Sequence, residues 1–163
     1  MAARRRSGRG RALPHVDYAT LADLRYQIRQ FLRVRETASR AAGLEPQQYL
    51  LLLQVKGMQG RGPATVGVLA ERLQVRHHSA VELIDRLVER GLVARKRGSG
   101  DRRQVLVEIR PAGDTVLRRL ALLSVAELRQ AGPKLVEVLT RLIGNHDAAG
   151  ARPSRRQPRG GPT

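Results

Sequence analysis

Apolar residues in the first part of the chain recur three and four positions apart. This spacing predicts an amphipathic helix over about 17–42 that ends near Gly43, with its apolar face formed by Leu21, Leu24, Ile28, Phe31 and Leu32. Glu45 and Pro46 open a second predicted helix, in which the run 49–55 is apolar on nearly all sides. We expect such a helix to be buried on most of its faces. Glycines and a proline between 57 and 63 then end it in a loop.

Two short helices are predicted next. Thr65 is placed to cap the first, whose apolar positions are Val68, Leu69 and Leu73. A four-residue polar link leads to the second, which ends at Gly91 and has apolar positions at Val81, Ile84, Leu87 and Val88. Two short helices joined this closely are typical of a helix-turn-helix.

The apolar period then changes to that of a strand. Residues 92–97 lead into a glycine-rich loop at 98–100, after which the apolar positions 105, 107 and 109 alternate with 106, 108 and 110, so a hairpin is predicted. Pro111 begins a new helical pattern, which predicts two terminal helices separated by Gly132 and Pro133. Both have more apolar surface than a small core needs.

Composition narrows the range of partners. The 163 residues include 31 Lys and Arg against 14 Asp and Glu, a formal net charge of +17, which favours a polyanion such as nucleic acid or an anionic membrane surface. Residues 1–12 and 147–163 are rich in Arg, Gly and Pro without apolar periodicity, so we expect disordered basic tails around one folded domain over 13–146.

Several classes of protein are disfavoured by what the sequence lacks. It has no cysteine, which excludes disulfides and thiolate metal sites. No apolar region follows the first arginines and no run of about 18 apolar residues occurs, so neither a signal peptide nor a membrane span is predicted and a cytoplasmic location is expected. Glycine-rich stretches at 98–100 and 60–65 lack the Gly-Lys-Ser/Thr ending of a phosphate-binding loop.

Two adjacent histidines begin the second short helix. Neighbouring helical side chains diverge by about 100°, so His77 and His78 cannot both bind one metal ion, and no carboxylate stands beside them at ligand spacing. Ser79 does not face His78 and no acid is placed to orient the imidazole, so a catalytic site is not supported. No cofactor is expected.

Two interpretations of this helix start remain. It is either a solvated polar cap or a helix end that enters the major groove of DNA. In the second case the residues near phosphates or base edges would be Arg76, His77, His78, Ser79 and Arg86. Glu82 lies on the same face, and DNA would repel it unless it accepts a hydrogen bond from a cytosine amine or pairs with Arg86 four residues on; we expect the pair with Arg86.

Basic residues also surround the predicted hairpin loop, namely Arg95, Lys96, Arg97, Arg102 and Arg103. A loop with two glycines can approach a DNA backbone closely, and an arginine can enter a narrow minor groove, where the potential is most negative. The alternative is a basic hairpin that is merely solvated.

Residues 65–113 resemble the winged-helix domain of the MarR family of bacterial transcriptional regulators. The resemblance rests on ATVGVLAERLQV (64–75), HHSAVELIDRLVERGLV (77–93) and GDRRQVLVEI (100–109), in which Asp101-Arg102-Arg103 matches the Asp-x-Arg motif of the family's wing. The order and length of the predicted helices also agree with the family, so the resemblance extends over about 13–145. The sequence departs from the family at Gln74, where the turn favours a left-handed glycine, and at Ile109-Arg110, where the family has Leu-Thr, so that Pro111 must begin the last helical part.

The resemblance implies a mainly α fold with a small β-hairpin wing, a DNA-binding lobe at about 61–111 and dimerisation helices at about 17–42 and 112–145. It also implies that Arg103 enters the minor groove, that Asp101 holds this arginine in place and that Arg102 meets phosphate. A homodimer would present two recognition helices about 34 Å apart to a pseudo-palindromic site in double-stranded DNA. A small-molecule effector is implied in a crevice between the dimer helices and the lobe, although three Tyr and one Phe offer few rings for stacking.

The predicted function is therefore a sequence-specific DNA-binding transcriptional regulator, a repressor relieved by a small-molecule effector and associated with the nucleoid. The alternative is an architectural protein that coats DNA without reading its sequence. An enzyme is not expected, because the sequence offers no set of acid, base and nucleophile.

Overall fold

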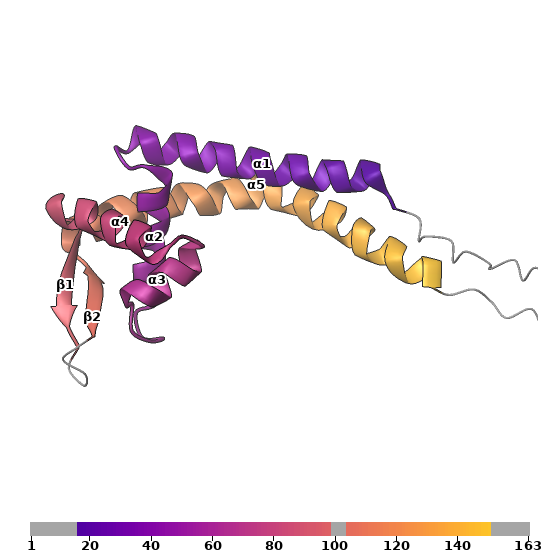
Figure 1. Ribbon diagram of the computed structural model, residues 1–163. Coiled ribbons are helices and arrows are strands. Elements are labelled where there is room, and N and C mark those ends of the chain that lie inside the picture. Colours follow the sequence, from indigo (N-terminus) through magenta and orange to yellow (C-terminus); the bar gives the residue numbers. More distant parts are fainter. Residues whose placement is uncertain (1–15, 99–103, 151–163) are drawn as a thin grey trace, which may run out of the picture.

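The computed structural model describes residues 16–98 and 104–150. Its elements in chain order (Figure 1) are α1 (Tyr18–Ala41), α2 (Pro46–Gly57), α3 (Val66–Leu73), α4 (His77–Glu89), β1 (Val93–Arg97), β2 (Val105–Ile109) and α5 (Pro111–Gly150). The predicted fold class, mainly α with a small hairpin, is confirmed. The predicted disorder of 1–12, and most of the predicted tail at 147–163, lie outside the described residues.

Helix starts follow the capping residues that the sequence suggested. The Thr65 hydroxyl accepts a hydrogen bond from the Val68 N–H at 3.3 Å, as expected of an N-cap. Pro46 is the first residue of α2, and the Glu45 N–H donates to Gln48 Oε1 at 3.1 Å, as one of the two contacts of a capping box between Glu45 and Gln48. These local bonds satisfy backbone groups that the first helical turns leave free.

Helix α2 lies in the centre of the molecule, in contact with α1, α3, α4, α5 and β2. Leu51 and Leu52 are fully buried, as expected of a helix that is apolar nearly all round. The exception is one edge, where Leu50 and Leu53 remain 38% and 37% exposed. The expectation of burial on most sides is met, and the exposed edge borders a cavity described below.

The two strands form an antiparallel hairpin in which Val93 faces Ile109 and Arg97 faces Val105. The Val107 N–H donates to the Ala64 carbonyl at 2.9 Å, which ties the outer edge of β2 to the segment before α3. Val107 and Val93 are buried and join the core around α2. The hairpin base is therefore fixed, while its strands extend away from the helical core (Figure 1).

The prediction of two terminal helices is wrong. Residues 111–150 form one helix, with Pro133 in its interior. Proline removes one hydrogen bond to the residue four positions back, here Arg129, but Pro133 is exposed and water can solvate the freed carbonyl. Leu120 and Val138 are buried on the two sides of the proline, so packing supports helix in both halves. Figure 1 shows α5 antiparallel to α1 and curving away from it toward its C-terminal end, and a proline is a standard cause of such bends.

Helix α5 begins in close contact with the hairpin base. A Cβ on Gly113 would lie 2.1 Å from the Leu92 carbonyl oxygen. That oxygen accepts a hydrogen bond from the Arg110 N–H at 3.0 Å, so it cannot shift without breaking the junction between strand and helix. Only glycine fits here without displacing backbone.

We predict that Gly113→Ala lowers the free energy of unfolding by about 3 kcal/mol, because the methyl group must displace main chain rather than a flexible side chain. Urea denaturation measures the change. Gly67→Ala in α3 is the matched control, because no atom lies within 4 Å of the added Cβ, and we expect it to leave stability unchanged or slightly higher. If the two substitutions changed the free energy of unfolding equally, the close approach of Gly113 to the Leu92 carbonyl would be contradicted.

Candidate nucleic-acid interface

Helices α3 and α4 form the predicted helix-turn-helix. The turn between them depends on Gln74, whose φ of 55° and ψ of 41° place it in the left-handed region. Among the described residues it is the only non-glycine with a positive φ, so the expected left-handed turn position is confirmed. The Val75 N–H donates to the Ala70 carbonyl at 3.0 Å and closes the turn. The link is 74–76, three residues rather than four, because His77 is already helical.

Helix α4 buries one face and exposes the other. Ala80, Ile84 and Leu87 have no exposed surface and fix the orientation of the helix. The outward face carries His78, Glu82 and Arg86, four residues apart and all exposed, so their side chains form one row.

Three further predicted contact residues lie at the start of α4. Arg76 is the N-cap, His77 is exposed in the first turn and Ser79 is half-buried. The helix start therefore presents polar side chains together with unpaired backbone N–H groups, an arrangement suited to phosphate.

The expected ion pair between Glu82 and Arg86 is wrong. No ion pair within 4.0 Å joins them in the described structure, which covers both side chains. Both are exposed, and such a pair contributes only about 0.2–0.5 kcal/mol, too little to hold two solvated side chains together.

The hairpin brings basic side chains next to α4. Arg95 of β1 forms an ion pair with Asp85 of α4, and Lys96 Nζ lies 3.2 Å from Glu108 Oε1 across the strands. Arg97 is exposed at the end of β1. Arg95, predicted as a contact residue, is thus engaged in joining the hairpin to α4. Asp101, Arg102 and Arg103 lie outside the described residues, so their predicted roles stay predictions.

Sequence reasoning missed two residues that hold α4 in position. Asp85 was not singled out, since only the packing of the hairpin brings Arg95 to it. At the other end of α4, Arg90 Nη1 donates to Gln48 Oε1 at 3.1 Å, which ties the C-cap of α4 to the first turn of α2. Glu45 and Gln48 form a capping pattern visible in the sequence, but nothing in it indicated Arg90.

A cavity of about 430 Å³ lies between α1, α2 and α5. Arg35, only 9% exposed, borders it and donates Nη1 to the Leu120 carbonyl at 3.4 Å. The Arg35 guanidinium also lies 6.0 Å from the ring centre of Tyr49, whose hydroxyl is 3.0 Å from Ser124 Oγ. Sequence reasoning expected a crevice in this region only through the family resemblance and did not identify Arg35.

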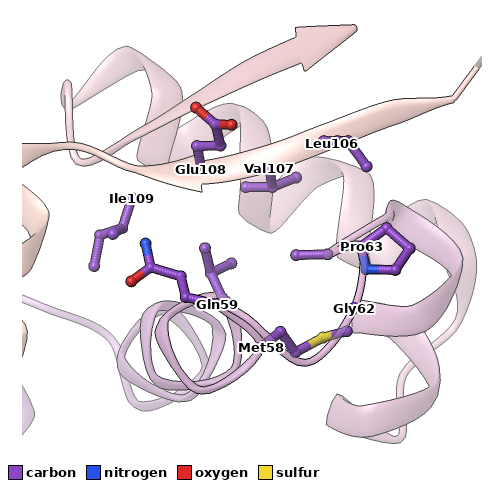
Figure 2. Close-up of a pocket in the computed structure, with 10 residues that line it drawn as sticks. Met58, Gln59, Gly62, Pro63, Leu106, Val107, Glu108 and Ile109 are labelled. Atoms are coloured by element: carbon purple, nitrogen blue, oxygen red, sulfur yellow. The ribbon is translucent and has the colours of Figure 1, made fainter. Parts of the chain in front are cut away.

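A second hollow, of about 380 Å³, lies behind the hairpin. Figure 2 shows β2 on one side of it, and the end of α2 with the following loop on the other. Glu108 is its one ionisable lining residue and points away from the hollow toward its partner Lys96. The hollow therefore offers no charged group to a ligand.

Other kinds of site find no support in the part of the chain that the structure describes. No group of three or more His, Cys, Asp or Glu side chains there could hold a metal ion. Over the same residues, none of the helices combines the length and the apolar character that crossing a membrane requires.

The arrangement of α3, turn, α4 and hairpin defines a winged helix-turn-helix protein. The model of the MarR family matches residues 42–104, which begin directly after α1 and end directly before β2. The resemblance stated from the sequence is confirmed over these residues, which match the model of the MarR family.

Solved structures agree along most of the chain. AbsC, a MarR family transcriptional regulator from Streptomyces coelicolor, is 19% identical with a TM-score of 0.64, covering 85% of this chain and 99% of its own. A probable transcriptional regulator from Pseudomonas aeruginosa is 26% identical, with a TM-score of 0.53 and coverages of 74% and 94%. A point mutant of MepR from S. aureus, solved bound to an oligodeoxyribonucleotide, is 15% identical, with a TM-score of 0.59 and coverages of 81% and 99%. A search of curated protein sequences finds no match.

We predict that Gln74→Gly raises the free energy of unfolding by about 0.5–1 kcal/mol, because glycine adopts the left-handed backbone without the steric cost that Gln74 bears. Thermal or urea unfolding measures the gain. Gln74→Ala is the control, since it removes the side chain but keeps the Cβ, and we expect no gain from it. If Gln74→Ala raised the free energy of unfolding as much as Gln74→Gly, the destabilisation at this position would come from the glutamine side chain and not from the left-handed backbone.

Proposed function

We propose that this protein is a sequence-specific DNA-binding regulator of transcription that acts as a homodimer and represses its targets until a small molecule releases it. The observation that carries the proposal is the joint placement of the outward face of α4 and the basic hairpin, which the Asp85–Arg95 ion pair holds together. A helix in the major groove and a wing beside it contact adjacent parts of one duplex. The MepR mutant bound to an oligodeoxyribonucleotide shares this fold and supports the proposal.

In the proposed complex the start of α4 enters the major groove. Arg76, His77, His78 and Ser79 meet phosphates there, and Arg86, further along the exposed row, reaches base edges or phosphate. Arg97 and Arg102 meet backbone phosphates from the wing. Arg103 enters the minor groove with Asp101 holding it, as the family motif suggests.

Apolar surface on α1 and α5 supports the homodimer. On α5 an exposed row comprises Val125, Leu128, Val136, Leu139 and Ile143, which follow one another at intervals of three, eight, three and four residues and so share one face of the helix. On α1 a second row comprises Leu21, Ile28 and Leu32. Helical spacing places the residues of each row on one face of their own helix. Exposed apolar surface of this extent is typical of an interface, and a twofold dimer would place two α4 helices about 34 Å apart.

We predict that Val136→Glu combined with Leu139→Glu converts the dimer to monomers, because two charges would be buried without partners. Sedimentation equilibrium measures the mass. Leu123→Glu is the control, since Leu123 is also exposed but lies on the opposite flank of α5, and the dimer should persist. If only Leu123→Glu abolished the dimer, the dimer interface would lie on the flank of α5 that carries Leu123.

Repression is proposed because a dimer bound across a promoter blocks it sterically without any further contact. Release by a small molecule requires a site whose occupancy favours one arrangement of the two recognition helices over another. The cavity between α1, α2 and α5 supports such a site, because the helix that forms one of its walls also anchors the end of α4 through the Gln48–Arg90 hydrogen bond.

The net charge of +17 favours a second candidate, an architectural protein that coats DNA. Genomic footprinting combined with an expression comparison in a deletion strain separates the two. Discrete sites upstream of genes whose transcripts rise in the deletion strain support the repressor. Continuous protection without a defined set of targets supports coating.

We predict that Arg103→Ala weakens binding to a footprinted site by about 1–3 kcal/mol, because it removes the arginine assigned to the minor groove. Fluorescence anisotropy at fixed salt measures the loss. Deletion of residues 1–12 is the comparison, and it should mainly reduce the slope of affinity against salt concentration, since those arginines can contribute only phosphate contacts. Unchanged affinity in Arg103→Ala would contradict the wing assignment.

A further inference from the structure

One acidic side chain lies in the middle of the face that α4 presents outward. Glu82 is exposed, with His78 four residues before it and Arg86 four residues after it. The buried residues Ala80 and Ile84 lie on the opposite side of the helix, so α4 cannot turn this carboxylate into the protein without exposing its own core face. If the outward face enters the major groove, Glu82 enters with it.

Glu82 has no charged partner within the part of the chain that the structure describes. Neither His78 nor Arg86 forms an ion pair with it, although both flank it on the same face. The neighbouring acid of α4, Asp85, differs in this respect, because it is paired with Arg95 of the hairpin. The carboxylate of Glu82 is therefore available to a group outside the chain.

A carboxylate close to DNA weakens binding unless a hydrogen-bond donor meets it. The phosphates repel it, and docking removes water from it without supplying a new partner. In the major groove only two bases present a donor, namely cytosine through its N4 amine and adenine through its N6 amine. The edges of guanine and thymine present acceptors there, and thymine adds a methyl group. Glu82 therefore requires a cytosine or an adenine opposite it.

Cytosine fits a carboxylate better than adenine does. Adenine presents its amine beside N7, whose lone pair repels the second carboxylate oxygen. The cytosine amine has no acceptor beside it on the same base. A carboxylate can thus accept from cytosine without facing a lone pair of that base.

We propose that Glu82 determines sequence specificity by accepting a hydrogen bond from the N4 amine of one cytosine in each half-site. This inference rests on the proposed function, because it assigns one base contact to the DNA-reading face. Arg86 follows about 6 Å further along the helix axis, and base pairs are stacked about 3.4 Å apart. Any base that Arg86 reads therefore lies within about two base-pair steps of this cytosine. A twofold dimer repeats the contact in the second half-site.

Selection of bound sequences from a random duplex library tests the assignment on the full chain, followed by affinity measurements on single-base variants of the selected site. The wild type should select cytosine at one position of each half-site, and replacing this C·G pair by T·A should weaken binding about tenfold or more. Glu82→Ala should reduce that difference to less than about twofold. The preferences at the other positions should stay, because the substitution leaves the rest of the face intact.

Glu82→Gln is the sharper variant, because a glutamine amide both donates and accepts and so matches adenine N7 and N6. The preference at the same position should change from cytosine to adenine. Glu89→Gln is the matched control, since Glu89 is also exposed, lies at the end of the same helix and changes the net charge equally. This control should keep the preference for cytosine. Urea denaturation should give all three variants the stability of the wild type, because both glutamates are exposed.

Two results would overturn the proposal. In the first, Glu82→Ala strengthens binding to all sequences equally and selects the same site as the wild type, so that the carboxylate only repels phosphate. In the second, the position that responds to Glu82 substitutions carries a base other than cytosine in the wild-type site. Either result leaves the proposed function standing, since the wild type still selects a defined sequence. A wild type that selects no sequence at all would refute the proposed function, and this inference with it.

Discussion

Leu51 and Leu52 of α2 are fully buried, and the neighbours of α2 come from α1, α3, α4, α5 and β2. Each buried leucine contributes about 1.5–3 kcal/mol, and it contributes only if all these elements are in place around it. The orientation of the helix-turn-helix relative to the long helices therefore depends on the packing around α2. The approach of Gly113 to the Leu92 carbonyl adds a second constraint, since it fixes where α5 leaves the hairpin.

Within this frame, α4 is held at both ends by polar contacts. Asp85 pairs with Arg95 of the hairpin, and Arg90 donates to Gln48 of α2. Partly exposed pairs of this kind contribute about 1 kcal/mol or less to stability, so their effect lies in orientation. They fix the angle of α4 to the wing on one side and to the first turn of α2 on the other. A protein that reads DNA with a helix and a wing needs both angles to be fixed.

Local signals in the sequence predicted most of the fold. Thr65 as a cap, the left-handed turn at Gln74 and the strand β2 are each decided by a few neighbouring residues, and the structure contains all three. The alternation within β2 is only partly met, since Val107 is buried but Val105 is exposed. Predictions failed where distant packing decides: Gly132 and Pro133 do not end α5, because buried residues on both sides keep the helix continuous. The Arg35–Glu127 pair joins residues on different helices, so no spacing rule could indicate it.

The central claim is that this fold reads a DNA sequence and does not merely bind a polyanion. The most direct measurement compares the affinity of the full chain for its own footprinted site with its affinity for random DNA of matched length at physiological salt. We expect a ratio of at least about a thousandfold, as is usual for specific regulators. A ratio near one would contradict the account and leave a basic protein that coats DNA.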